Sequence, residues 1–143
     1  MSDGMTPDEI KAVINRHCQS ALETPFAYGR SDCCTFACDV VREVTGVDPM
    51  ADLRGRYATR PQAVATQFDA TDGGLVDTVQ MLARQSGFAQ TFFPWSGHLV
   101  GIVATPVGPV MGLFDGTAWI VRSERGIARM AAHLGVLGWS FAP

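Results

Sequence analysis

The periodicity of the hydrophobic residues changes once along this chain, near Phe88, and this change constrains the fold more than any other feature. Before Phe88 the hydrophobic residues recur at the spacing of amphipathic helices, and after it they follow the patterns of β-strands. Helices followed by strands indicate an α+β fold, in which the helices pack on one face of an antiparallel sheet. No repeat, linker or low-complexity run marks a boundary, so we expect one domain over residues 1–143.

Several residues indicate where the helices begin and end. A first helix is predicted from Pro7, because Thr6 can cap it and Glu9 can complete a capping box. Ser31 can cap a second helix, which Gly46 would end. Two more helices are expected over residues 61–68 and 75–85, and strands over residues 88–93, 98–105, 110–114, 118–123 and 136–141.

Charge and hydropathy exclude several classes of function. The net charge of -3 leaves no basic stripe to neutralise phosphates, so we expect no nucleic-acid binding and predict protein, peptide or glycan partners. The most apolar stretch, residues 98–114, is interrupted by Pro106 and Pro109, which argues against membrane insertion. The polar, acidic N-terminus lacks the features of a signal peptide.

The four cysteines, Cys18, Cys33, Cys34 and Cys38, all lie in the first quarter of the chain. Their spacing suits helices better than a disulfide framework, and it lacks the paired C-x-x-C units of a structural zinc site. We therefore expect reduced thiols, folding in a cytoplasm, no metal and no cofactor.

Cys33 has the position that a cysteine nucleophile needs. It follows the expected cap of the second helix, where unpaired backbone N–H groups and the helix dipole favour a thiolate. The alternative is structural, because Cys33 shares a helix face with Phe36 and Val40 and a buried cysteine is commonly inert.

Residues 26–36, Phe-Ala-Tyr-Gly-Arg-Ser-Asp-Cys-Cys-Thr-Phe, resemble the nucleophile segment of the NlpC-like, papain-like cysteine peptidases. They resemble still more a group of uncharacterised phage and prophage tail proteins related to those enzymes, which continue as here at residues 44–49 and 54–57. The resemblance implies an NlpC-like sheet, Cys33 in the nucleophile position and Asp32 as a supporting residue of the motif. It also implies a histidine base on a strand of the following sheet.

The resemblance leaves two placements for the base. Aligned strand by strand, the histidine position falls on Val110, and the third polar residue falls near Arg122, a cation that cannot accept the imidazole N–H. With one residue inserted, the stretch that begins at Gly97 supplies His98 as the base instead. In the first alignment His98 occupies the position of an aspartate in the peptidases.

Two functions follow from the resemblance. The first is a structural or adaptor component of a phage-type tail tip or hub, assembled in the host cytoplasm, located in the virion tail and bound to other tail proteins. Val110 and Arg122 favour it, because they stand where polar catalytic residues are expected. The second is an active cysteine endopeptidase or amidase that cleaves peptidoglycan stem peptides during genome entry, with Cys33 as nucleophile and His98 as base. An enzyme of the same fold acting on another amide or acyl substrate is a third possibility.

Overall fold

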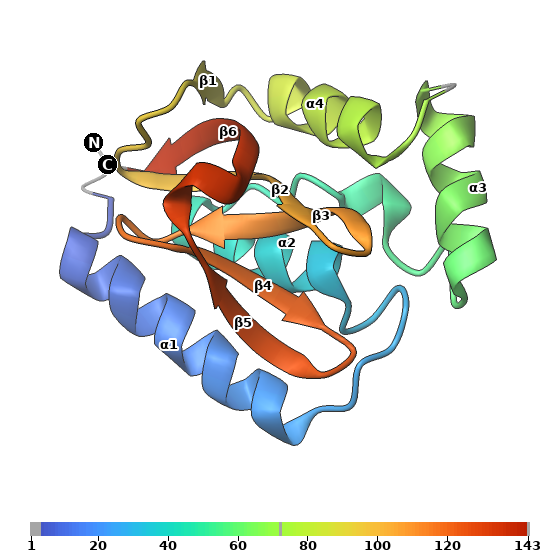
Figure 1. Ribbon diagram of the computed structural model, residues 1–143, viewed down its shortest axis with the longest axis horizontal. Coiled ribbons are helices and arrows are strands. Elements are labelled where there is room, and N and C mark those ends of the chain that lie inside the picture. The colour runs from blue at the N-terminus through green and yellow to red at the C-terminus, as the bar shows by residue number, and fades with distance from the viewer. Residues whose placement is uncertain (1–3, 72, 143) are drawn as a thin grey trace.

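The structure, a computed structural model, describes residues 4–71 and 73–142, without the side chains of residues 68 and 69, and it has helices in its first half and strands in its second. The predicted α+β class is confirmed (Figure 1). The helices are α1 (Pro7–Glu23), α2 (Cys33–Thr45), α3 (Arg60–Thr71) and α4 (Leu75–Gln85), with short 3-10 turns η1 (Ala51–Leu53) and η2 (Ala132–Leu134). The strands are β1 (Ala89–Thr91), β2 (His98–Thr105), β3 (Gly108–Phe114), β4 (Trp119–Ser123), β5 (Gly126–Met130) and β6 (Gly135–Ala142).

The start of α1 and both ends of α4 follow from the sequence. The Thr6 hydroxyl accepts the N–H of Glu9 at 3.2 Å, which completes the predicted capping box of α1. The bounds of α4 are those predicted, whereas α3 is longer than expected at both ends. None of the described helices is both long and apolar enough to cross a membrane.

The cap of α2 is Asp32, and the prediction of Ser31 was wrong. Asp32 accepts the N–H of Thr35 at 2.8 Å, and the Thr35 hydroxyl accepts the N–H of Asp32 at 2.8 Å. The Ser31 hydroxyl instead donates to the carbonyl of Pro25 at 2.6 Å. A carboxylate accepts a backbone N–H more strongly than a hydroxyl does, so the helix begins one residue later, at Cys33.

The strands form one antiparallel sheet in the order β1-β6-β2-β3-β4-β5. The last strand, β6, lies between β1 and β2, so the C-terminal segment is enclosed within the sheet rather than at its edge. Strand β5 was not predicted, because it is short, partly exposed and at an edge, where hydrophobic alternation is weak. Strand β1 is shorter than expected.

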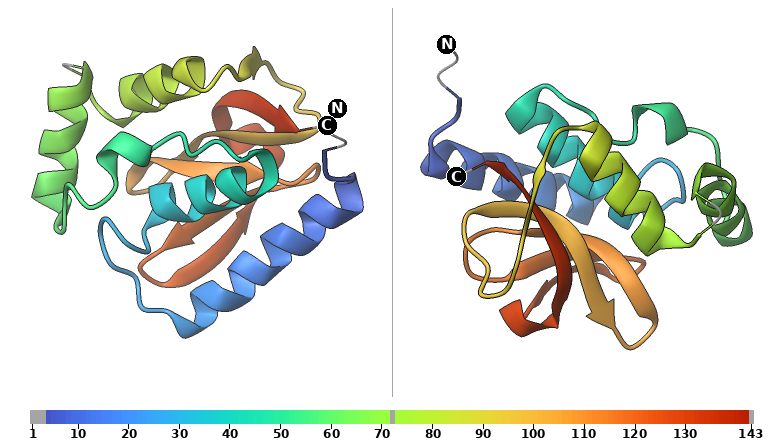
Figure 2. Two further views of the ribbon diagram at one scale, coloured as in Figure 1. Left: turned by 180° about the vertical axis from the view of Figure 1, so that it is seen from behind. Right: turned by 90° about the horizontal axis from the view of Figure 1, so that it is seen from above.

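The helices cover one face of the sheet, with α2 packed against β3 and β4 and α1 alongside α2 and β5 (Figure 2, right). Side chains of successive strand residues point to opposite faces, which separates two hydrophobic clusters. Val100, Ile102, Met111, Leu113 and Ile120 face the helices, whereas Leu99, Val103, Phe114, Trp119 and Val121 form the cluster on the other face. Helix α2 therefore lies over the middle strands of the sheet.

Candidate functional site

Asp32 organises the segment that precedes the candidate nucleophile. Its carboxylate is 2% exposed and accepts three hydrogen bonds, each 2.8 Å long: from the N–H groups of Thr35 and Gly29 and from the Tyr57 hydroxyl. These bonds fix the start of α2 and join it to a residue 25 positions later. Asp32 thus positions Cys33 through the backbone of the helix.

Position 29 requires glycine, because the loop before α2 packs closely against the backbone of Tyr57. Its φ of +82° lies in the left-handed region, and a Cβ built there would lie 2.0 Å from the carbonyl oxygen of Tyr57. Any larger residue would push the loop away from Tyr57. The glycine that precedes the Asp-Cys pair therefore has a structural reason that is independent of chemistry.

The Cys33 thiol is the first side chain of α2, is partly exposed and lies 3.8 Å from the sulfur of Cys34. The hydrogen bond with the Cys34 thiol lowers the pKa of Cys33, and hydrogen bonds from the N–H groups of Met111 and Cys34 act in the same direction. Burial opposes them. The net direction favours a thiolate at Cys33.

The other three cysteines do not share this property. The hydrogen bond to Cys33 and burial raise the pKa of Cys34, whereas burial is the main cause that raises the pKa of Cys18 and Cys38. Among the four thiols, only that of Cys33 has its pKa lowered, so Cys33 is the candidate for a reactive thiolate. Within residues 4–71 and 73–142, no three His, Cys, Asp or Glu side chains gather in a way that could hold a metal ion.

The strand residue beside Cys33 is Met111, on β3. Its backbone N–H reaches the Cys33 sulfur, and its side chain belongs to the cluster that faces the helices. Val110, which the alignment placed here, packs against the cluster on the opposite face. The structure therefore assigns this position to Met111 instead of Val110, because neighbouring strand residues point to opposite faces.

His98 is buried, 6% exposed, at the start of β2, and the structure does not bring it beside Cys33. Met111 pairs with Ile102, which lies four residues after His98 along β2. At about 3.3 Å per residue, His98 is displaced by roughly 13 Å along the strand from the position that faces Cys33. Its ring lies near Phe141 instead, with centroids 6.5 Å apart.

The remaining histidines have other surroundings. His17, on α1, lies 2.9 Å from the carboxylate of Glu43 on α2, and His133 is exposed in η2. The pKa of Cys33 is set mainly by hydrogen bonds from Cys34 and Met111, by burial and by the charge of Asp32. No histidine in the described part of the chain is among these main causes. The roles predicted for Cys33, Asp32 and His98 in catalysis stay predictions.

Arg122 lies on β4 and points toward the helices. The register pairs Leu113 with Ile120, and its continuation by two residues would bring Met111 opposite Arg122. Its guanidinium donates to the carbonyl of Thr24 at the end of α1. Met111 and Arg122 thus lie on neighbouring strands and face the helices. Neither side chain can accept a proton from a thiol at neutral pH.

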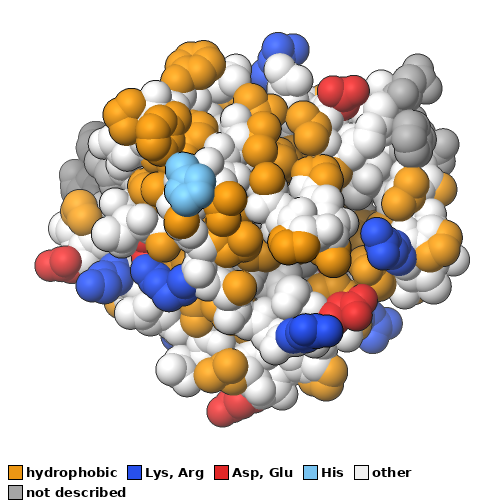
Figure 3. All heavy atoms as spheres, in the orientation of Figure 1, with side chains coloured by type: hydrophobic (Ala, Val, Ile, Leu, Met, Phe, Trp, Pro, Cys, Tyr) orange, Lys and Arg blue, Asp and Glu red, His pale blue; other side chains and the backbone are white. Residues whose placement is uncertain are grey.

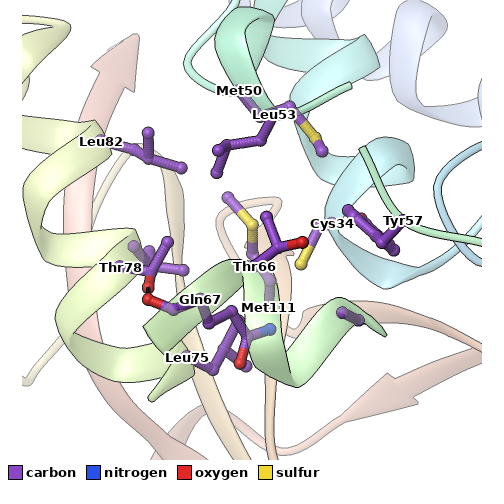
Figure 4. Close-up of a pocket in the computed structure, with 12 residues that line it drawn as sticks. Cys34, Met50, Leu53, Tyr57, Thr66, Gln67, Leu75, Thr78, Leu82 and Met111 are labelled. Atoms are coloured by element: carbon purple, nitrogen blue, oxygen red, sulfur yellow. Dashed lines mark hydrogen bonds between the residues drawn. The ribbon is translucent and has the colours of Figure 1, made fainter. Parts of the chain in front are cut away.

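A second feature of the structure is a cavity beside Cys34 that Cys33 does not line. An apolar cavity of about 30 Å³ lies between α2, α3, α4 and β3, and the side chains of Cys34, Tyr57 and Met111 line it (Figure 4). This volume admits one or two water molecules and no peptide side chain. A cavity of this volume has no room for a peptide substrate.

Residues 7–141 match the model of a family described as a domain of unknown function (DUF6950). The chain belongs to this family. Among curated proteins none matches the chain. The description assigns no chemistry to the family, so the chemistry of the site rests on its geometry.

Sequence reasoning missed two of the residues that define this site. Tyr57 was noted only as part of the resemblance, because nothing in the local sequence indicates a hydrogen bond to Asp32 across 25 positions. Met111 carried no signal, since a methionine in an apolar strand is ordinary core material.

Proposed function

We propose that this protein is a structural or adaptor component of a phage-type tail tip or hub, with a peptidase-like fold that lacks a catalytic base. One observation carries the proposal: the strand position beside Cys33 holds Met111, and His98 lies four residues along β2 from Ile102, the residue that pairs with Met111. The resemblance of residues 26–36 to tail proteins supplies the context.

Papain-like hydrolysis needs more than a thiolate. An imidazole takes the thiol proton and later donates a proton to the departing amine, and general acid–base catalysis of this kind contributes about 10²–10⁴-fold. The hydrogen bonds at Cys33 help to form the thiolate but supply no acid for the leaving group. A thioether at Met111 cannot replace the imidazole.

The surface offers a place where a partner protein could bind. Phe92 and Phe93, between β1 and β2, are 73% and 59% exposed. Hydrophobic side chains gather over β1 and the segment that follows it in the space-filling view (Figure 3). Exposed aromatic side chains of this kind are enriched where proteins bind one another, which fits an assembly component.

The proposal is tested by mass spectrometry of purified virion-like particles from cells that produce this protein. We expect the chain at a fixed low ratio to the major tail proteins, and lower incorporation after Phe92→Ser combined with Phe93→Ser. Leu22→Ser is the control, because Leu22 is 69% exposed on α1, on a different element. Particles that assemble and infect normally without the chain contradict the proposal.

An active peptidase or amidase is the second candidate, and the lowered pKa of Cys33 favours it. Purified protein would be incubated with muropeptides and the products separated by chromatography. An enzyme that uses the predicted pair loses hydrolysis in both Cys33→Ala and His98→Ala. If the His98→Ala variant still hydrolyses muropeptides, His98 is excluded as the base. If the unaltered protein hydrolyses none, the structural function is supported.

A further inference from the structure

A polar cavity of about 120 Å³ lies between the C-terminal end of α1, the N-terminal end of α2 and β4. Its walls include Ser20 and Thr24 from the end of α1, Arg30 from the loop, Thr35 from α2 and Arg122 from β4. The volume admits several water molecules or one small polar group. Cys33 does not line this cavity, so it is separate from the thiol.

Arg122 is an unusual residue to line such a cavity, because its side chain carries a permanent charge and the residue is only 6% exposed. Its guanidinium donates one hydrogen bond to the carbonyl of Thr24, and its Nε has no partner among the described residues. No described carboxylate forms an ion pair with it. A buried cation without a counter-ion costs several kcal/mol, so such groups are ordinarily paired.

The acidic groups nearest the cavity already have cationic partners. The carboxylate of Asp39 lies 2.9 Å from the guanidinium of Arg54, and that of Glu43 is bound by Arg16 and His17. These residues therefore leave little negative charge to balance Arg122.

Arg30 adds a second cation to the same cavity. It is exposed and forms no ion pair within residues 4–71 and 73–142. The Ser20 hydroxyl also lines the cavity and can add a neutral donor. Two guanidinium groups and a hydroxyl thus converge on one cavity from three separate elements.

We propose that this cavity binds a carboxylate group, with Arg122 and Arg30 as the charged donors. A guanidinium donates two parallel hydrogen bonds to a carboxylate, which suits a small planar ligand. A phosphate dianion fits less well, because Asp39 also lines the cavity; Arg54 offsets part of the charge of Asp39, and the repulsion that remains is about twice as large for a dianion as for a carboxylate. The proposal does not depend on the function proposed above.

The test follows the arginine Nε–H signals by NMR while sodium acetate is added at constant ionic strength, with sodium chloride as the reference. Acetate should shift the Arg122 signal saturably, with a Kd in the millimolar range, which is about 4 kcal/mol of binding free energy at 1 mM. Arg30→Gln should weaken binding about threefold to tenfold. Arg125→Gln is the control, since Arg125 is exposed in the β4–β5 turn and does not line the cavity.

Further ligands identify the source of the carboxylate. A tripeptide with a free C-terminus that binds more tightly than acetate, while its amide does not bind, indicates a carboxylate carried by a peptide. Equal affinities of acetate and tripeptide indicate a small free acid. The proposal is overturned if acetate and chloride have the same effect, if inorganic phosphate binds more tightly than acetate, or if Arg30→Gln binds acetate as well as Arg125→Gln does.

Discussion

The N-terminal end of α2 and the strands beneath it differ in which parts of a cysteine-hydrolase active site they contain. At the helix, Asp32, Gly29 and Tyr57 hold Cys33 in place, and backbone N–H groups favour its thiolate. On the strands, Met111 occupies the neighbouring position and Arg122 lies beyond it. The helix end has what a nucleophile needs, whereas the described strands place Met111 and Arg122, and not an imidazole, nearest to it.

This difference has a physical reason. The hydrogen bonds that place Cys33 are also the cap of α2 and the attachment of Tyr57, so their loss would destabilise the protein whatever its activity. A base on β3 would make no comparable contribution to stability, because an apolar side chain fills the same space in the core. The helix end is therefore constrained by folding, and the strand position is constrained only by packing.

The comparison predicts the largest effect for Gly29→Ala. Both Gly29 and Gly46 have positive φ, at +82° and +79°, but only Gly29 has a backbone atom within 4 Å of a built Cβ. We expect Gly29→Ala to lower the free energy of unfolding by about 3 kcal/mol, against about 1 kcal/mol for Gly46→Ala. Urea denaturation followed by circular dichroism measures both, and equal losses would show that the contact with Tyr57 is unimportant.

Asp32→Ala should have the next largest effect. It removes the helix cap and leaves the Gly29 N–H and the Tyr57 hydroxyl without their acceptor, which together cost about 2 kcal/mol. Asp52→Ala is the control, because Asp52 is exposed in η1. The same denaturation experiment decides, and a change in Asp32→Ala no greater than in the control contradicts the role of Asp32.

The strand side should be more tolerant. Met111→Leu keeps volume and hydrophobicity, so we expect a loss of about 1 kcal/mol or less. Because the Met111 N–H persists in this variant, the pKa of Cys33, read from the thiolate absorbance near 240 nm, should stay the same. A large rise in that pKa would show that the side chain, and not the backbone, sets the thiol chemistry.

The sequence was sufficient for the α+β class and for most element bounds, because capping residues and hydrophobic periodicity are local properties. It failed at the cap of α2, where Ser31 and Asp32 are adjacent good caps and only the packing of Tyr57 decides between them. It also missed β5, an edge strand whose partner β4 gives it order through backbone pairing.

The site was harder to predict than the fold. The position of Cys33 at a helix start followed from local residues. Which strand residue lies beside it depends on the register between β2 and β3 and on how α2 packs against them. A shift of one residue exchanges the two faces of a strand, so an alignment that named Val110 was one residue from Met111 and pointed to the opposite face. The buried charge of Arg122 was likewise invisible before its neighbours were known.

Within residues 4–71 and 73–142 the structure places no histidine beside Cys33. This arrangement is tested most directly by the pH dependence of Cys33 alkylation by iodoacetamide, located by peptide mass spectrometry. We predict a single ionisation below the ordinary thiol pKa of about 8.5, unchanged in His98→Ala and His17→Ala, because Cys34 and backbone N–H groups favour the thiolate. Cys38, buried and with a raised pKa, should react slowly throughout. A second ionisation near pH 6–7 that disappears in either histidine variant would contradict the account.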